Sequence, residues 1–370
     1  DILLCGYFNE NIDLWNLAST DIMPDSLEYA TNGTPKHLLR NLGDGKFEDV
    51  TEKVGLLKNA WTLASIAADL RGTGYPDIFL ANDYGKAELW RNDGGKRFTD
   101  IGKEAVTQQP KSGMNAVMGD IYNDGRLSIQ VSNIWEDNLL QQGNNVWVPK
   151  DGNKPGQLLY ENQANSLGLE NGGWSFGAQF GDLNNDGIKD IVYGGGTDGV
   201  FSNNGIMAYN GANGNLLWKR AARNEVFGSA VFMDITNDGV KDVFMVGRQA
   251  QLLAINGSNG ALLWDYFPYN TNPADSGLYN FYNPQFIADV SGDGIQDILV
   301  ANGGDHAAPV WDTNRPPGHL MVVNSMNGQL LAKAVVPDSA ETYCSALVAD
   351  VQGNGTQWVL YGTGGETLGG

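Results

Sequence analysis

Acidic side chains recur along this chain at a spacing that suits a bound metal ion. Residues 182–190 read DLNNDGIKD, which places side-chain oxygens at positions 1, 3, 5 and 9 of a nine-residue loop and glycine at position 6. Calcium prefers six to eight oxygen ligands, and the backbone carbonyl of position 7 can supply another. Glycine at position 6 allows the sharp turn that aims these oxygens at one point. The loop therefore predicts a calcium site.

Three copies of this loop keep three carboxylates each. The predicted ligands, with position 7 contributing its carbonyl, are Asp182, Asn184, Asp186, Ile188 and Asp190; Asp234, Thr236, Asp238, Val240 and Asp242; and Asp289, Ser291, Asp293, Ile295 and Asp297. Three negative charges in one short loop repel one another without a cation. The alternative, an Asx turn without metal, leaves that charge unbalanced. We expect about three calcium ions, in consecutive repeats.

Three further copies depart from the pattern. The loop from Asp69 carries Arg71 at position 3, and we expect this guanidinium to lie between Asp69 and Asp77 as a built-in cation. The loops at 120–128 and 350–358 have also lost ligand positions. Whether the loop at 120–128 binds a metal ion remains an open question, and we expect no metal ion in the loop at 350–358.

The repeat also predicts the fold. Each loop precedes an apolar strand and further β-rich runs joined by Asn-Gly or Asp-Gly turns. The copies begin about 50 to 60 residues apart, which is the length of one four-stranded blade with its loops. Counting a partial copy at the start, we predict an all-β chain: a seven-bladed propeller of four-stranded antiparallel blades. We expect one domain over 1–370 that is a fragment of a longer protein. The recurring Trp90, Trp218 and Trp264 are expected to anchor blade packing.

Composition excludes some classes of function. The 370 residues carry a formal net charge of −20, and such a surface repels nucleic-acid phosphates. No apolar stretch reaches the roughly 18 residues of a membrane span. The two cysteines, Cys5 and Cys344, lie in the first and last repeats, and a disulfide or two thiols both remain open.

The motif resembles the FG-GAP/VCBS repeat family. The resemblance rests on D-x-[DN]-x-[DN]-G-x-x-D followed by an apolar strand, and on LLRNLGDGKFEDVTEKVGL at 38–56. Members of this kind include the integrin α-subunit propeller and the cartilage acidic protein (ASPIC/UnbV) group. The later hairpins, ending in G-x-L-L-W, are similar to those of quinone-dependent propellers. The resemblance implies a β-propeller with calcium in some blades.

Long insertions provide the candidate partner surface. By their order along the chain, 9–35, 134–157, 266–284 and 302–319 fall on the face opposite the metal loops. Their aromatic side chains are Trp15, Trp135, Trp147, Tyr266, Tyr269, Tyr279, Tyr282 and Trp311. Tyr and Trp are enriched at interface hot spots, so we hypothesise that this face binds a protein or glycan. The alternative, that these rings pack the insertions onto the blades, stays open.

Catalytic residues are scarce. Of three histidines, His37 is interpreted as structural, whereas His306 and His319 share one insertion with Asp305, Asp312 and Arg315. These residues form the one cluster in the sequence that resembles an active site. They leave open an alternative function as a polysaccharide lyase or quinone-dependent oxidoreductase. Without a nucleophile and base, we expect no catalytic residues and no enzyme.

The favoured function is therefore a calcium-binding adhesion, assembly or recognition module. Calcium is abundant outside cells, which favours an extracellular or cell-surface location. Sequons at Asn32 and Asn256 would permit glycosylation there.

Overall fold

The computed structural model describes the chain in two compact units. One comprises residues 1–175 with 351–354, and the other comprises 176–350 with 355–370. Within them, the described residues are all except 10–21, 110–111, 137, 139, 155, 173–174, 198, 270–279, 304–315, 338–341, 343–344 and 363–370. The prediction of one domain over 1–370 stays a prediction.

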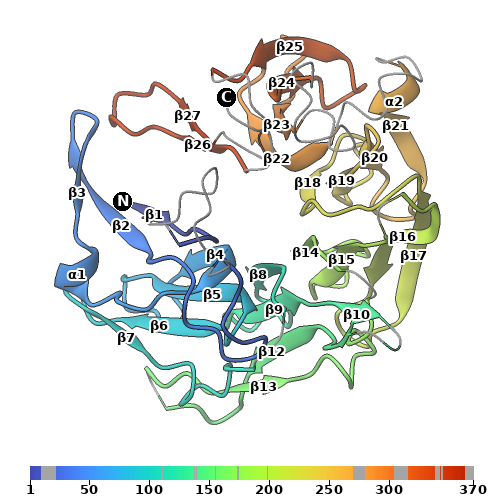
Figure 1. The fold of residues 1–370 in the computed structure, drawn as a ribbon. Helices are drawn as coiled ribbons and strands as arrows, with labels where there is room; N and C mark the ends of the chain where they lie inside the picture. The colour runs from blue at the N-terminus through green and yellow to red at the C-terminus, as the bar shows by residue number, and fades with distance from the viewer. Residues whose placement is uncertain are drawn as a thin grey trace. The chain divides into compact units, whose positions relative to one another are not determined.

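The first unit contains antiparallel sheets whose strands follow one another along the chain (Figure 1). A three-stranded sheet holds β1 (Ile2–Leu4), β2 (His37–Gly43) and β3 (Lys46–Asp49), followed by α1 (Thr51–Val54). The next holds β4 (Trp61–Ala68), β5 (Asp77–Tyr84), β6 (Glu88–Asn92) and β7 (Phe98–Asp100). The third holds β8 (Asn115–Gly119), β9 (Ser128–Ser132), β12 (Asn145–Pro149) and β13 (Tyr160–Asn162), with a hairpin of β10 (Trp135–Glu136) and β11 (Leu140–Gln141) inserted.

The second unit repeats the same meander three times (Figure 1). Its first sheet holds β14 (Ala178–Gly181), β15 (Asp190–Gly194), β16 (Ser202–Tyr209) and β17 (Leu216–Ala222). The second holds β18 (Val231–Met233), β19 (Asp242–Val246), β20 (Leu252–Ile255) and β21 (Leu262–Asp265), followed by α2 (Tyr266–Tyr269). The third holds β22 (Phe281–Ile287), β23 (Asp297–Asn302), β24 (His319–Val323) and β25 (Leu330–Val335), and β26 (Leu347–Ala349) pairs with β27 (Trp358–Leu360).

The blade count corrects the prediction of seven. Among the described residues there are five complete four-stranded blades, and the three-stranded sheet β1–β3 is a sixth. Seven copies of the loop do not make seven blades, because the last copy forms only the two-stranded hairpin β26–β27. Among the described residues, helix is limited to α1 and α2, which agrees with the predicted all-β class. None of the helices in the described part of the chain could cross a membrane.

The second strand of each complete blade forms the core. Every residue of β9, β15, β19 and β23 is buried, because these strands are covered on both faces. After their first aspartate, β15, β19 and β23 are therefore mostly unbroken apolar runs, whereas β9 (SIQVS) alternates and buries polar side chains as well. The three predicted metal loops end where β15, β19 and β23 begin, so each loop is joined to a fully buried strand of its blade.

Tryptophans connect successive blades of the second unit. The indole N–H of Trp218 donates to the Gly257 carbonyl at 2.6 Å, and that of Trp264 donates to the Ser325 carbonyl at 2.8 Å. Gly328 has a left-handed φ of 75°, and a Cβ there would lie 2.6 Å from the Trp264 ring. Both tryptophans are buried, which confirms their prediction as packing anchors.

Replacing Trp264 by Phe tests this link. The change keeps a packed ring but leaves the buried Ser325 carbonyl without its indole donor, so we expect the free energy of unfolding to fall by about 1–3 kcal/mol. Urea unfolding followed by fluorescence measures it. The matched control is Trp358→Phe on the exposed hairpin strand β27. Equal effects at both positions would show that the indole hydrogen bond contributes nothing.

Candidate metal centres

All six complete copies of the loop share one backbone turn. Each joins the first two strands of its sheet. The position-1 carboxylate accepts the N–H of the position-6 glycine, at 2.5 to 3.1 Å. Those glycines have φ between 81° and 92°, a conformation that side chains with a Cβ rarely adopt. The role predicted for glycine at position 6 is confirmed.

Position 4 carries a constraint that the sequence reasoning missed. Asn123, Asn185 and Asn237 have φ of 53°, 57° and 56°, and the other three copies place a left-handed glycine there. Asn and Gly are the residues that enter this conformation most readily. The signal was present in the sequence, since every complete copy has Asn or Gly at position 4.

The position-9 carboxylate forms the floor of each predicted calcium loop. Asp190, Asp242 and Asp297 are each 0 % exposed, because each is the first residue of a core strand. One oxygen of each accepts the N–H of position 2, at 2.7 to 2.9 Å. The side chains of positions 1 and 9 are thus both hydrogen-bonded to the loop's own backbone without any metal.

The position-5 carboxylate is held from a second hairpin of the same sheet. One of its oxygens accepts the N–H of position 7, at 2.8 to 2.9 Å. The other accepts a side-chain amide from the turn between the third and fourth strands. These amide pairs are Asn210 to Asp186 at 3.2 Å, Asn256 to Asp238 at 3.1 Å, and Asn324 to Asp293 at 2.7 Å. The sequence reasoning treated these asparagines only as turn residues.

The position-3 side chains lie beside the carboxylates. Thr236 Oγ1 is 3.5 Å from Asp234 and 3.4 Å from Asp242, and Ser291 Oγ donates to Asp289 at 3.1 Å. The structure therefore brings positions 1, 3 and 9 together in the second loop, as the spacing predicted. Among the described residues, no three or more His, Cys, Asp or Glu side chains lie close enough together, in the conformation seen, to hold a metal ion.

Two of the three loops hold a buried oxygen with no hydrogen-bond partner. These atoms are Asp182 Oδ1 and Asp297 Oδ1. In the first loop, burial and the charges of Asp186 and Asp182 raise the pKa of Asp190 to about 6. Burial likewise raises the pKa of Asp242. Buried, unpartnered carboxylate oxygens are costly, and a hard cation relieves that cost. The donor set therefore fits calcium.

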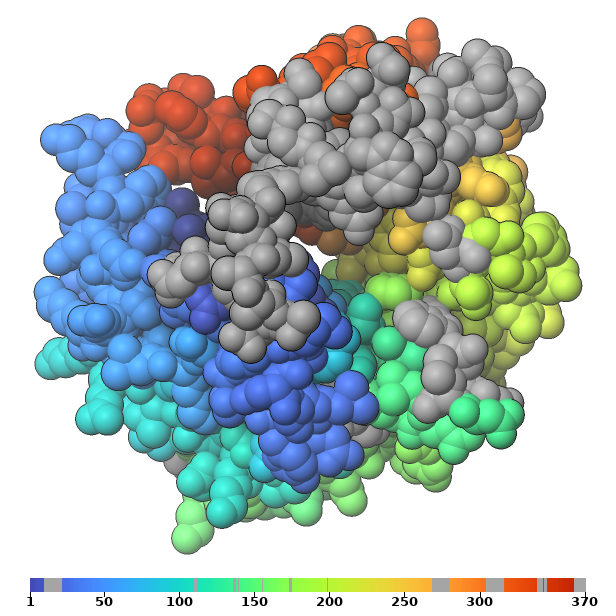
Figure 2. Space-filling view, viewed as in Figure 1, coloured from blue at the N-terminus to red at the C-terminus, as the bar shows by residue number. Residues whose placement is uncertain are grey.

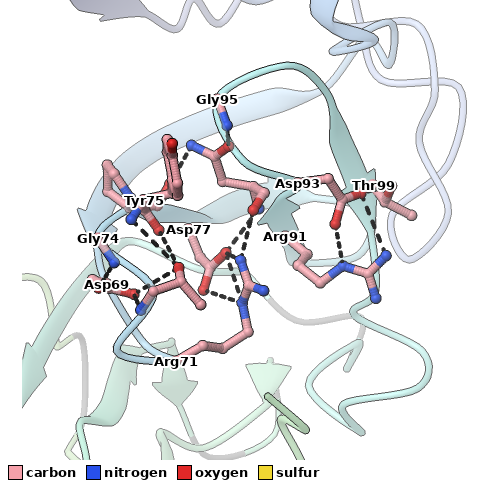
Figure 3. A network of polar contacts seen from close by, with 12 residues as sticks. Asp69, Arg71, Gly74, Tyr75, Asp77, Arg91, Asp93, Gly95 and Thr99 are labelled. Carbon is pink, nitrogen blue, oxygen red and sulfur yellow. Dashed lines mark hydrogen bonds and ion pairs between the residues drawn. The ribbon is translucent and has the colours of Figure 1, made fainter.

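The loop from Asp69 contains an arginine in place of a metal ligand (Figure 3). The Arg71 guanidinium donates to Asp77 through Nε at 3.0 Å and Nη2 at 2.9 Å. The same Nη2 donates to the Asn92 carbonyl at 2.6 Å. Asp69 instead accepts backbone N–H groups of its own loop. The built-in cation was predicted correctly, but it pairs with Asp77 and not with Asp69.

A second arginine belongs to the loop at 120–128. Arg126, at position 7, donates from Nε to Asp124 at 2.9 Å and also pairs with Asp151 at 3.0 Å. Both complete loops of the first unit thus contain an arginine–aspartate pair. The sequence reasoning identified the first arginine and overlooked the second.

The predicted partner-binding aromatics divide into buried and half-buried groups. Trp147 and Tyr266 are each 1 % exposed and pack in the core, so their prediction as contact residues is wrong. The reason is that Trp147 lies within strand β12, and Tyr266 packs on Phe281 at 5.2 Å between ring centroids. Trp135 and Tyr282 are half-buried. Trp15, Tyr279, Trp311 and the Tyr269 side chain lie outside the described residues.

The remaining predicted residues give little support for chemistry. His37 Nδ1 lies 2.8 Å from an oxygen of the Asp49 carboxylate, which fits its structural interpretation. His319 lies on β24, where burial lowers its pKa. The rest of its predicted cluster, at 305–315, lies outside the described residues, as does Cys344. Burial raises the pKa of the Cys5 thiol to about 11.

Family models match two parts of the chain. Residues 69–131 match the FG-GAP-like repeat, and residues 202–368 match the FAM234A/B beta-propeller. No curated protein matches. Together with the four-stranded blades, these matches identify the chain as a member of the FG-GAP β-propeller proteins.

Solved structures are similar to this chain at low sequence identity. Sqt1 of Saccharomyces cerevisiae is 13% identical with a TM-score of 0.50, over 82% of this chain and 75% of that one. The biofilm matrix protein Bap1 of V. cholerae is 16% identical with a TM-score of 0.48, over 75% of this chain and 40% of its own. Rhamnogalacturonan lyase YesW is 17% identical with a TM-score of 0.42, over 90% and 50%. The chain thus spans half or less of the last two.

Proposed function

We propose that this chain is a calcium-binding extracellular β-propeller that serves as a non-enzymatic adhesion, assembly or recognition module. The observation that carries the proposal is the repeated carboxylate set of the second unit, in which Asp182 and Asp297 each keep a buried oxygen without a partner. Calcium is the cation best suited to such hard oxygen donors.

Each ion would be held by positions 1, 3, 5 and 9 and by the position-7 carbonyl. Calcium supplies charge neutralisation, and the loop draws its carboxylates around it. Because position 9 begins a core strand and position 5 is held by the asparagine of another hairpin, the ion ties three strands of one blade together. That role is structural, since a ligand set drawn from one short loop leaves little room for substrate.

Calcium titration of an Asp182→Asn variant tests the proposal. Asparagine can still accept the Gly187 N–H, so the turn is kept while one ligand charge is lost. Calorimetry is expected to show one site fewer than in the unmodified protein. The control is Asp69→Asn, in the loop where Arg71 supplies the cation, and it should keep the full number. Loss of the same number of sites in both variants, or in neither, would refute the assignment.

Asn256→Ala is a milder test of the same centre. Removing the amide frees one oxygen of Asp238, and loss of such an outer-shell partner typically costs about tenfold or more in metal affinity. The matched control is Asn259→Ala, at an exposed position of the same turn. Equal calcium affinities in the two variants would remove Asn256 from the centre. Because Asn256 is 8 % exposed, we also expect its sequon to stay unmodified.

The recognition surface is proposed on the long-loop face. In each meander, the connection between strands two and three leaves from the end opposite the metal loop. Trp135 and Tyr282 remain candidates there, with Trp15, Tyr269, Tyr279 and Trp311 from the sequence. A Trp15→Ala/Trp311→Ala variant is expected to keep calcium binding but lose retention on a glycan- or protein-coated surface. Retention equal to that of the unmodified chain would move recognition elsewhere.

A further inference from the structure

A cavity of about 550 Å³ lies in the first unit, at the end of its blade opposite the loop from Asp69. It is lined by the segment 29–31, by residues 58–60, and by the connection between β5 and β6. The segment that supplies Tyr29 is packed on that connection, because the Gly85 N–H donates to the Leu27 carbonyl at 3.1 Å. This part of the chain is exposed on the side drawn in Figure 2, where it is dark blue. The volume is that of a small-ligand pocket.

The floor of the cavity holds a buried ion pair. Lys36 and Glu88 are 1 % and 5 % exposed, and Lys36 Nζ lies 3.1 Å from Glu88 Oε2. The Trp90 indole N–H donates to the same oxygen at 2.6 Å. Burying a charge pair gives little or no net stability compared with apolar side chains. A buried charge pair beneath a cleft is therefore a candidate functional feature.

Other blades show what a purely structural residue looks like at this position. Strand pairing aligns Glu88 with residues of the third strand in each blade of the second unit. The aligned residues are Met207, Leu253 and Met321. The fold thus accepts an apolar side chain here, and the charge of Glu88 with its partner Lys36 is specific to the blade that has the cavity.

One lysine of the cavity lining has no carboxylate partner among the described residues. Of the three charged residues that line the cavity, Glu88 pairs with Lys36 and Lys58 pairs with Asp100, which leaves Lys86. The nearby Asp25 carboxylate accepts the N–H and the hydroxyl of the lining residue Thr31. An ammonium group without a carboxylate partner can attract an anionic ligand.

Its uncharged walls suit a sugar ring. The Tyr29 side chain is 57% exposed, and Lys86 Nζ lies 5.2 Å from the centre of its ring. Asn59 and Gln108 add side-chain amides that can donate to and accept from hydroxyl groups. An aromatic face beside amides and a lysine offers stacking, hydroxyl recognition and carboxylate recognition in one place.

We propose that this cavity binds the uronate residue of an acidic glycan, with Lys86 facing the carboxylate and Tyr29 stacking on the sugar ring. The inference rests on the recognition part of the proposed function and narrows its partner to a carboxylate-bearing sugar. No bond is made or broken in this role. The calcium centres lie in the other unit, so the two assignments fail separately.

Digalacturonate and its methyl ester are a matched pair of probes that differ in charge. Calorimetry with the full chain in calcium is expected to detect binding of the acid. The affinity for the ester should be at least about tenfold lower, which corresponds to the loss of one charge-assisted hydrogen bond. Lys86→Met should lower the affinity for the acid by a similar factor and leave the affinity for the ester unchanged. Tyr29→Ala should lower the affinity for both sugars. Lys96→Met, at an exposed turn, is the control.

The proposal is overturned if acid and ester bind equally, if neither binds, or if Lys86→Met leaves the acid unaffected. Thermal unfolding of each variant confirms that it is folded before titration. Calcium titration of the same samples separates the two assignments, because full calcium binding without uronate binding refutes this inference alone.

Discussion

Removing calcium is expected to lower the midpoint of thermal unfolding sharply. At a free calcium concentration one hundred times the dissociation constant, one site stabilises the folded state by about 2.7 kcal/mol. For a unit of this size, that corresponds to a shift of roughly 5–10 °C for each loop. The three loops from Asp182, Asp234 and Asp289 lie in one compact unit, so we expect their effects to accumulate there.

Scanning calorimetry in calcium and in EGTA measures the shift. Magnesium is the control cation, because it demands a tighter octahedral shell and loses its waters reluctantly, and it should restore little of the stability. The combined variant Asp182→Asn/Asp234→Asn/Asp289→Asn should unfold at the same temperature in both buffers. A midpoint of the unmodified protein that is the same in calcium and EGTA would contradict a structural role for the ion.

Arg71→Met is expected to destabilise the first unit by about 3–5 kcal/mol, because it leaves a buried charge without its partner. Asp77 is fully buried, and the guanidinium is the cationic group that the structure places on it (Figure 3). The substitution also removes a donor from the Asn92 carbonyl. Chemical unfolding followed by fluorescence gives the change in free energy, which should not respond to calcium.

A rescue substitution and a control substitution in a more exposed ion pair test this prediction further. Asp77→Asn added to Arg71→Met removes the stranded charge and still lets position 77 accept the Asn92 N–H, so much of the stability should return. Arg91→Met breaks the partly exposed pair with Asp93, and the expected loss is under about 1 kcal/mol. Equal losses for Arg71→Met and Arg91→Met, or no recovery in the double variant, would show that Arg71 is not the cation of this loop.

The repeated turn could be predicted from the sequence because its causes are local. Glycine at position 6 and Asp at position 9 are dictated by backbone conformation and by the start of a core strand, and both appear in the residue pattern. The arginine at position 71 was also predictable, since it replaces a ligand within the same short loop. Its choice of Asp77 over Asp69 depends on burial, which the loop sequence alone does not show.

The remaining features depend on contacts between distant segments. Asn210, Asn256 and Asn324 read as ordinary turn residues until the third and fourth strands bring them beside position 5. The sequence reasoning assigned Trp147 to a long insertion. In the structure the inserted hairpin β10–β11 ends at Gln141, and Trp147 already belongs to the next blade strand, β12, which begins at Asn145. The charged cavity likewise joins a segment near residue 30 to the β5–β6 connection, which no short motif predicts.

Counting bound calcium tests the account most directly. After equilibrium dialysis against buffered calcium and removal of loosely bound ions, elemental analysis of the protein is expected to give about three calcium ions per chain, and about two for Asp182→Asn. A protein that retains no calcium, or a count that Asp182→Asn leaves unchanged, would contradict the assignment of the ions to these loops.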